Sequence, residues 1–195
     1  AEPQAIGFLS RMNDENGFNI LIDAFILLKE NVAFSNLKLK ATGGMTGDDT
    51  RFINHQLQKL KQKSIIGEVE ILPDFTPAAL RDFFKSISVL SVPVLKGEAF
   101  GLYQLEALAS GVPLVQPELG AFPEIINATG GGVTYQPNTA DALAAKLTEV
   151  LSDTKNLQKM SLAGRKAVEE NFDCSKLSIR MAGIYATCQS SRTSL

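Results

Sequence analysis

Two carboxylates eight positions apart are the residues best suited to chemistry in this sequence. Glu98 stands in a loop just before a predicted helix, and Glu106 stands on the second turn of that helix. The amides of Phe100, Gly101 and Leu102 fall in the first turn, where N–H groups have no partner within the helix. Together with the helix dipole, these amides form an anion site suited to a phosphate, with a carboxylate beside it that can accept hydrogen bonds from sugar hydroxyls.

A purely structural interpretation of the same pair is also open. An acidic residue before a helix commonly just complements the helix dipole, and Glu106 would then lie on a solvated stripe. Against this, no residue three or four positions from Glu106 can form an ion pair with it. The helix is mostly apolar, so we expect it to be largely covered, and a covered carboxylate is costly unless something donates a hydrogen bond to it.

Strand-sized apolar runs alternate with helix-length amphipathic stretches along the chain. This order is typical of βαβ units, and it predicts an α/β fold with a six-stranded parallel sheet in one compact domain over residues 1–195. The expected strands are 5–9, 37–42, 69–72, 87–92, 113–115 and 132–135. The expected helices are 17–31, 48–63, 77–85, 101–110, 139–151, 157–171 and 175–187.

The loops that follow the strands are where function is expected, because doubly wound sheets bind ligands at the carboxyl ends of their strands. These loops are 10–17, 43–47, 73–76, 93–101 and 116–121. The glycines at 43, 44 and 47 do not have the G-x-G-x-x-G spacing of a dinucleotide fingerprint. A Rossmann-like oxidoreductase is therefore disfavoured.

Composition narrows the function classes further. Lys and Arg number 19 against 21 Asp and Glu, a formal charge of −2, so nothing favours binding to nucleic acid. The longest apolar runs fall short of the ~20 residues of a membrane span, and no signal peptide is visible. Two cysteines cannot form a disulfide framework, so a cytoplasmic setting is expected. With a single histidine and no CxxC, no metal site is expected.

The Glu98 to Glu106 spacing within EAFGLYQLEALASGVP resembles the signature of the retaining glycosyltransferases of family 4, the glycosyl transferases group 1. Ile6 to Arg11, followed by Gly17, resembles the first strand and the "GR…KG" loop of that family. Segments 116–126 and 130–133 resemble its later segments, so the likeness covers about residues 5–187. It implies a Rossmann-like three-layer domain, the C-terminal half of a two-domain GT-B fold.

The resemblance implies a role for each residue that matches a family motif. Glu98 would hold hydroxyls of the donor sugar, and Glu106 would hold the ribose hydroxyls of the nucleotide. The amides of residues 100–102 would hold the diphosphate. Arg11 would stabilise the charge on the departing diphosphate, a task that suits its forked and permanently charged guanidinium.

Three further positions belong to the implied site. Gly17 matches the glycine of the loop after the first strand, and Phe75 is expected to line the base pocket, with a core aromatic as an equal alternative. The family has a lysine five residues after the arginine, where this sequence has Asn16. Asn16 carries no charge, which puts turnover in doubt, and Lys96 is the nearest substitute cation in the sequence.

The implied function is transfer of a hexosyl group from a UDP-, GDP- or ADP-sugar to an acceptor hydroxyl, with no cofactor. The implied partner is the N-terminal acceptor-binding domain of the same full-length enzyme, on which the last helix, 175–187, would pack. Peripheral membrane contact through that domain is left open, and the isolated domain is expected to be inactive. A non-catalytic nucleotide-sugar-binding module derived from such an enzyme is the alternative, with Asn16 as the motivating feature.

Overall fold

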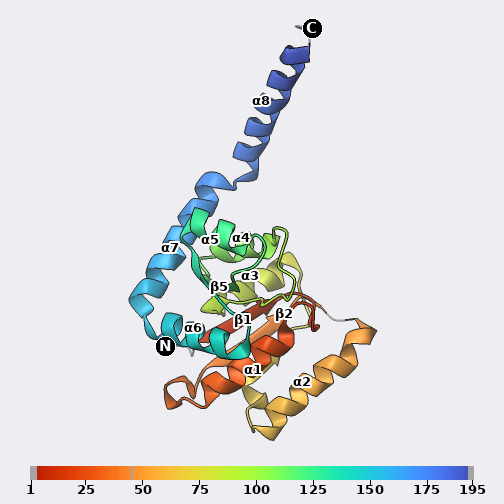
Figure 1. Cartoon of the computed structure of the whole chain (residues 1–195), viewed down its shortest axis with the longest axis vertical. Coiled ribbons are helices and arrows are strands. Elements are labelled where there is room, and N and C mark those ends of the chain that lie inside the picture. The colour runs from red at the N-terminus through yellow and green to blue at the C-terminus, as the bar shows by residue number, and fades with distance from the viewer. Residues whose placement is uncertain (1–3, 45, 193–195) are drawn as a thin grey trace.

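The centre of the computed structural model, which describes residues 4–44 and 46–192, is one parallel sheet between two layers of helices (Figure 1). Every residue of β1 is buried, as expected for a central strand covered on both faces. The strand order is β3-β2-β1-β4-β5-β6. The strands are β1 (Ala5–Leu9), β2 (Lys38–Thr42), β3 (Val69–Ile71), β4 (Val89–Leu90), β5 (Leu114–Pro117) and β6 (Gly132–Tyr135).

The strand order reverses between β1 and β4, which lie side by side at the centre of the sheet. Ile6 pairs with Val89 and Gly7 with Leu90. From this pair the chain proceeds outward to β2 and β3 on one side, and to β5 and β6 on the other. The loops that follow β1 and β4 therefore leave the sheet in opposite directions, and such a reversal is where doubly wound sheets form their ligand crevice.

Two groups of helices cover the sheet. The side chains of α1, α2 and α6 pack in one hydrophobic cluster, and those of α3, α4 and α5 contribute to a second. Helix α7 lies against α4 and α5. The helices are α1 (Phe18–Lys29), α2 (Thr50–Gln62), α3 (Pro77–Lys85), α4 (Leu102–Ala109), α5 (Phe122–Thr129), α6 (Ala140–Ser152), α7 (Thr154–Asn171) and α8 (Cys174–Arg192).

The six strands and seven helices expected from the sequence are all present, with bounds that shift by a few residues. The largest shift is at the fourth strand: residues 87–92 are mostly buried as expected, yet only Val89–Leu90 pair as a strand. Helix α5 is an element that the sequence reasoning missed. Its signals were Pro123 near its start and the apolar pair Ile125 and Ile126, but eight residues between two glycines give little periodicity.

Helix α8 extends away from the rest of the fold (Figure 1). Its exposed apolar side chains are Leu177, Ile179, Met181, Ile184 and Tyr185. Across residues 4–44 and 46–192, no helix has both the length and the apolar character that a bilayer crossing needs.

Candidate functional site

The loops after β1 and β4 are in direct contact at the carboxyl end of the sheet. The amide of Leu95 donates a hydrogen bond to the carbonyl of Glu15 at 2.9 Å. Gly17 has a left-handed φ of +72°, and a Cβ at this position would lie 1.9 Å from the carbonyl oxygen of Pro93. Only a glycine fits so close to that backbone. The fold therefore places loop 10–17, which carries Arg11, against loop 93–101, which carries Glu98.

Arg11 is held by the carboxylate of Asp49, a residue that lies 38 positions later in the sequence. Its Nε donates to Oδ2 of Asp49 at 2.8 Å, and its Nη2 donates to Oδ1 at 2.9 Å. Nη2 also donates to Oγ1 of Thr46 at 2.8 Å. The Asp49 side chain is only 6% exposed, whereas that of Arg11 is 47% exposed. The guanidinium holds the pKa of the Asp49 carboxyl well below its usual range, chiefly through this hydrogen bonding.

Asn16 lies beside Arg11, as the alignment of the loop requires. Its side-chain Nδ2 donates to the carbonyl oxygen of Arg11 at 2.9 Å, and its own amide donates to Oδ1 of Asn13 at 2.9 Å. These bonds close the loop on itself. The position where the resemblance expects a second cation is thus occupied by a neutral side chain that stabilises the loop.

Glu98 is half-buried next to the first turn of α4. Its Oε1 accepts a hydrogen bond from the amide of Ala99 at 3.1 Å, and its carbonyl accepts one from the amide of Ala121 at 2.9 Å. A Cβ on Gly101, whose φ is +71°, would lie 2.8 Å from Cγ of Glu98. Burial, and after it the Glu98 charge, raises the pKa of Tyr103. Glu98 therefore lies beside the first turn of α4, whose amides are the predicted anion site.

Gln104 fixes the loop that carries the predicted amide site, a role that sequence reasoning missed. Its Nε2 donates to the carbonyl of Phe100 at 2.7 Å, and its side chain is fully buried. The side chains of Phe100 and Leu102 are exposed at the start of α4. Amides at such a helix start are free to bind an anion.

The prediction that Glu106 is covered is wrong, because its side chain is exposed. Helix α4 buries Gln104, Ala107 and Leu108 against the fold, which places Glu106 on the opposite side. It lines a hollow of about 330 Å³ in which Arg81 of α3 is the one cation among the lining residues. The lining residues are Pro77, Leu80, Arg81, Phe84, Glu106 and Ser110.

The alternative that Phe75 is a core aromatic is also wrong, since its side chain is 55% exposed. A Cβ on Gly44 would lie 3.4 Å from Cε1 of its ring. The amide of Met12 in turn donates to the carbonyl of Gly44 at 3.3 Å. Phe75 therefore lies at the same end of the sheet as Arg11, over the loop that follows β2.

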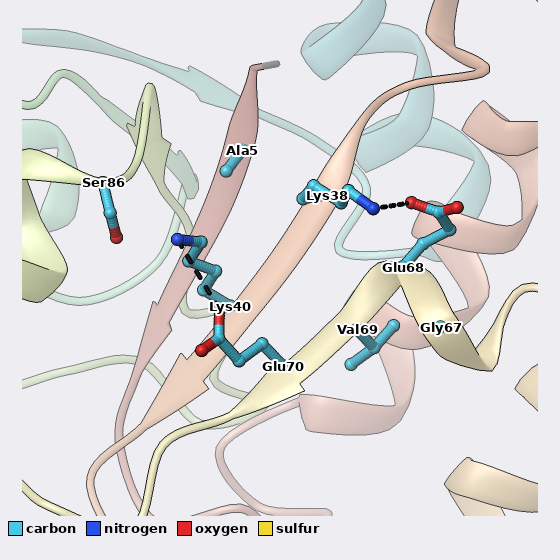
Figure 2. Close-up of a pocket in the computed structure, with 8 residues that line it drawn as sticks. All are labelled: Ala5, Lys38, Lys40, Gly67, Glu68, Val69, Glu70 and Ser86. Carbon is cyan, nitrogen blue, oxygen red and sulfur yellow. Dashed lines mark ion pairs between the residues drawn. The ribbon is translucent and has the colours of Figure 1, made fainter. Parts of the chain in front are cut away.

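A hollow of about 420 Å³ lies at the opposite, amino end of the strands. Figure 2 shows its two lysines, each directed to a glutamate. Lys38 pairs with Glu68, and Lys40 pairs with Glu70 at 3.6 Å. Because its cations are already paired and it lies away from the loops after the strands, this hollow is not the predicted site. Within the described residues, no three metal-ligating side chains gather as an ion site would require.

Comparisons with known sequences point to one family. The family model described as "Glycosyl transferases group 1" matches residues 1–167. The D-inositol 3-phosphate glycosyltransferase of Corynebacterium diphtheriae is 25% identical over 93% of this chain and 42% of its own length. The chain spans about half the length of the curated relatives it matches.

Solved structures show the same fold. The C-terminal domain of a group 1 glycosyl transferase (LpcC) from Francisella tularensis aligns with a TM-score of 0.78 and 24% identity, over 88% of this chain and 87% of that one. Alr3699/HepE of Anabaena, solved in complex with UDP, aligns with a TM-score of 0.85 and 18% identity, over 96% of this chain and 50% of that one. The fold is thus the Rossmann-like C-terminal half of the GT-B architecture.

Proposed function

The chain belongs to the glycosyl transferases group 1, and from that premise we propose that it is the donor-binding domain of a retaining glycosyltransferase. The enzyme would transfer a hexosyl group from a nucleoside-diphosphate sugar to an acceptor hydroxyl. The observation that supports this most is the contact between the Arg11 loop and the Glu98 loop where the strand order reverses. The carboxyl ends of the strands at such a reversal are where doubly wound sheets bind nucleotides.

Each part of the donor has a group to receive it in this proposal. The amides of residues 100–102 and the guanidinium of Arg11 bind the diphosphate, and Glu98 binds hydroxyls of the sugar. Glu106 binds the ribose from the hollow between α3 and α4, and the exposed ring of Phe75 lies against the base. Gly17 lets the two loops close on each other, and Asn16 holds the Arg11 loop in shape.

In the proposed chemistry, this domain contributes mainly by electrostatic stabilisation of the departing diphosphate and less by proton transfer from its side chains. The bond between the anomeric carbon and the diphosphate oxygen breaks while the acceptor oxygen bonds to that carbon on the same face, which retains the configuration. The proton of the acceptor hydroxyl passes to the departing diphosphate oxygen. Negative charge then develops on the diphosphate. Preorganised donors aimed at developing charge often lower the barrier more than any other single effect, and Arg11 and the helix amides supply such donors here. These roles use no metal ion.

The partner in this proposal is the N-terminal acceptor-binding domain of the same enzyme. The exposed apolar side chains of α8, among them Leu177 and Ile184, suit a helix that packs on another domain. The acceptor site would lie on that domain, so the chain alone would bind donor and transfer nothing. A cytoplasmic location and a peripheral membrane contact through that domain stay predictions.

A second candidate is a binding module that has lost catalysis. The observation that favours it is electrostatic: Asn16 carries no charge, and the charge of Arg11 is compensated by Asp49. Loss of one preorganised donor at a transition state costs about 2.7–4 kcal/mol. Turnover of a donor sugar by the full-length enzyme would decide between the two candidates.

A thermal-shift and calorimetric panel of UDP, GDP and ADP, each with its sugars, tests the proposal. We expect one nucleotide series to stabilise the chain, since ligand at about 100 times its Kd adds ~2.7 kcal/mol to the free energy of unfolding. NAD serves as the control ligand. Stabilisation by NAD and by none of the three nucleotides would indicate an oxidoreductase and refute the proposal.

A further inference from the structure

We propose that Asp49 is a positioning residue for the diphosphate subsite: together with Thr46 it holds Nε and Nη2 of the Arg11 guanidinium, so that Nη1 is left available to the ligand. This inference rests on the proposed function. Asp49 takes Nε and Nη2 of Arg11. Among residues 4–44 and 46–192, no hydrogen bond from Nη1 is found, and the Arg11 side chain is 47% exposed.

The carboxylate is itself held rigidly. It accepts two hydrogen bonds from Arg11 and two from Thr46, whose amide donates at 2.7 Å and whose hydroxyl donates at 2.9 Å. The same hydroxyl accepts from Nη2 of Arg11, which closes a triangle of three side chains. Asp49 is also anchored by the turn of 3-10 helix Gly47–Asp49 that leads into α2. A side chain fixed at this many points can fix its partner.

Two effects of the carboxylate oppose each other at an anion site. Its charge repels a diphosphate, whereas its hydrogen bonds orient the guanidinium. We expect orientation to dominate, because a long arginine side chain that is free to rotate loses more conformational entropy when it binds. The dependence is strong here because Arg11 is the one cationic side chain in residues 10–17. In the resembled family a lysine at the position of Asn16 would also interact with the charge of the diphosphate, and Asn16 carries no charge to do so.

The substitution Asp49→Asn separates the two effects by the sign of the change. An amide has one acceptor oxygen and one NH2 group, so it cannot accept from Nε and Nη2 on two separate oxygens as the carboxylate does, and its NH2 would face a guanidinium N–H. Positioning predicts that the Kd for UDP, or for whichever nucleotide binds best in the panel, rises about tenfold, or ~1.4 kcal/mol. Removal of repulsion alone predicts that the Kd falls. Asp48→Asn is the matched control, since it removes the same charge from the exposed neighbouring side chain, and we expect it to leave the Kd unchanged or slightly lower.

A double-mutant cycle measured by calorimetry with that nucleotide tests whether Asp49 acts through Arg11. In the Arg11→Ala background, Asp49→Asn should leave the Kd unchanged or lower, because only the repulsion by its charge remains to be removed. The NMR signal of the Arg11 Nε–H should be sharp in the unsubstituted chain and lost in Asp49→Asn, a signature that loss of stability elsewhere would not produce. If Asp49→Asn does not fold, Thr46→Ala opens the same triangle, and we expect a smaller weakening of binding.

The outcomes are distinguishable. An unchanged or lower Kd in Asp49→Asn overturns the positioning role, as does an equal loss in the Arg11→Ala background. If the unsubstituted chain binds none of UDP, GDP and ADP, the proposed function fails first and the positioning role falls with it. Binding by the unsubstituted chain that does not depend on Asp49 refutes the positioning role alone.

Discussion

Substitution of Gly17 by alanine would test the contact that holds the two site loops together. The left-handed φ of +72° costs a non-glycine residue about 1–2 kcal/mol. The added Cβ would also lie 1.9 Å from the Pro93 carbonyl oxygen, and backbone cannot yield as a side-chain end can. Overpacking of this kind costs about 1–3 kcal/mol. We therefore expect Gly17→Ala to lower the free energy of unfolding by roughly 2–5 kcal/mol.

Urea unfolding followed by circular dichroism measures the change, and Gly67→Ala is its matched control. A Cβ on Gly67 would meet nothing within 4 Å. The free energy of unfolding of Gly67→Ala should therefore stay within about 0.5 kcal/mol of that of the unsubstituted chain. Where Gly17→Ala still folds, the Arg11 loop should shift relative to the Glu98 loop, and nucleotide affinity should fall with it. If Gly17→Ala is as stable as the control, the two loops do not meet as described and the reasoning is refuted.

The site supports three more predictions. Asn16→Lys should tighten nucleoside-diphosphate binding about 2- to 30-fold, measured by calorimetry. A charged hydrogen bond to the ligand contributes ~1.5–3 kcal/mol, while the lost bond to the Arg11 carbonyl costs ~1 kcal/mol. Unchanged or weaker binding would mean that the loop is misaligned with the family motif. Glu106→Gln should leave the free energy of unfolding within about 0.5 kcal/mol of that of the unsubstituted chain, since the side chain is exposed. It should weaken the binding of UDP but not that of pyrophosphate, and equal weakening of both would contradict a ribose role. Burial raises the pKa of the Tyr135 and Tyr103 hydroxyls in the folded chain above their values in the unfolded chain. Their contribution to the free energy of unfolding is therefore complete below pH ~10 and is lost as the pH rises further. Urea unfolding between pH 8 and 11 should show this decline, and Tyr135→Phe should reduce it.

The sequence predicts the strands and helices of the fold well, because the signals involved are local. Apolar runs such as 5–9 are long enough to mark buried strands, and the carboxyl end of each strand follows from its direction alone. Gly17 and Asn16 could be placed beside Arg11 for the same reason, as one short loop holds all three.

Features that depend on distant segments could not be predicted. Asp49 is 38 positions from Arg11, and only the pairing of β1 with β2 brings their loops together. The sequence of residues 46–49 is fully explained by helix capping, so it gave no reason to look for a cation. The exposure of Glu106 depends on which face of α4 packs on the fold, and a short, mostly apolar helix does not reveal that face in its own sequence.

Binding of a nucleoside diphosphate where the strand order reverses is tested most directly by amide NMR during titration with the nucleotide selected by the panel. We expect chemical shifts to change at Arg11, at Gly101 and Leu102, and around Glu106. Changes confined to the paired lysines at the amino end of the strands, Lys38 and Lys40, would contradict binding at the reversal.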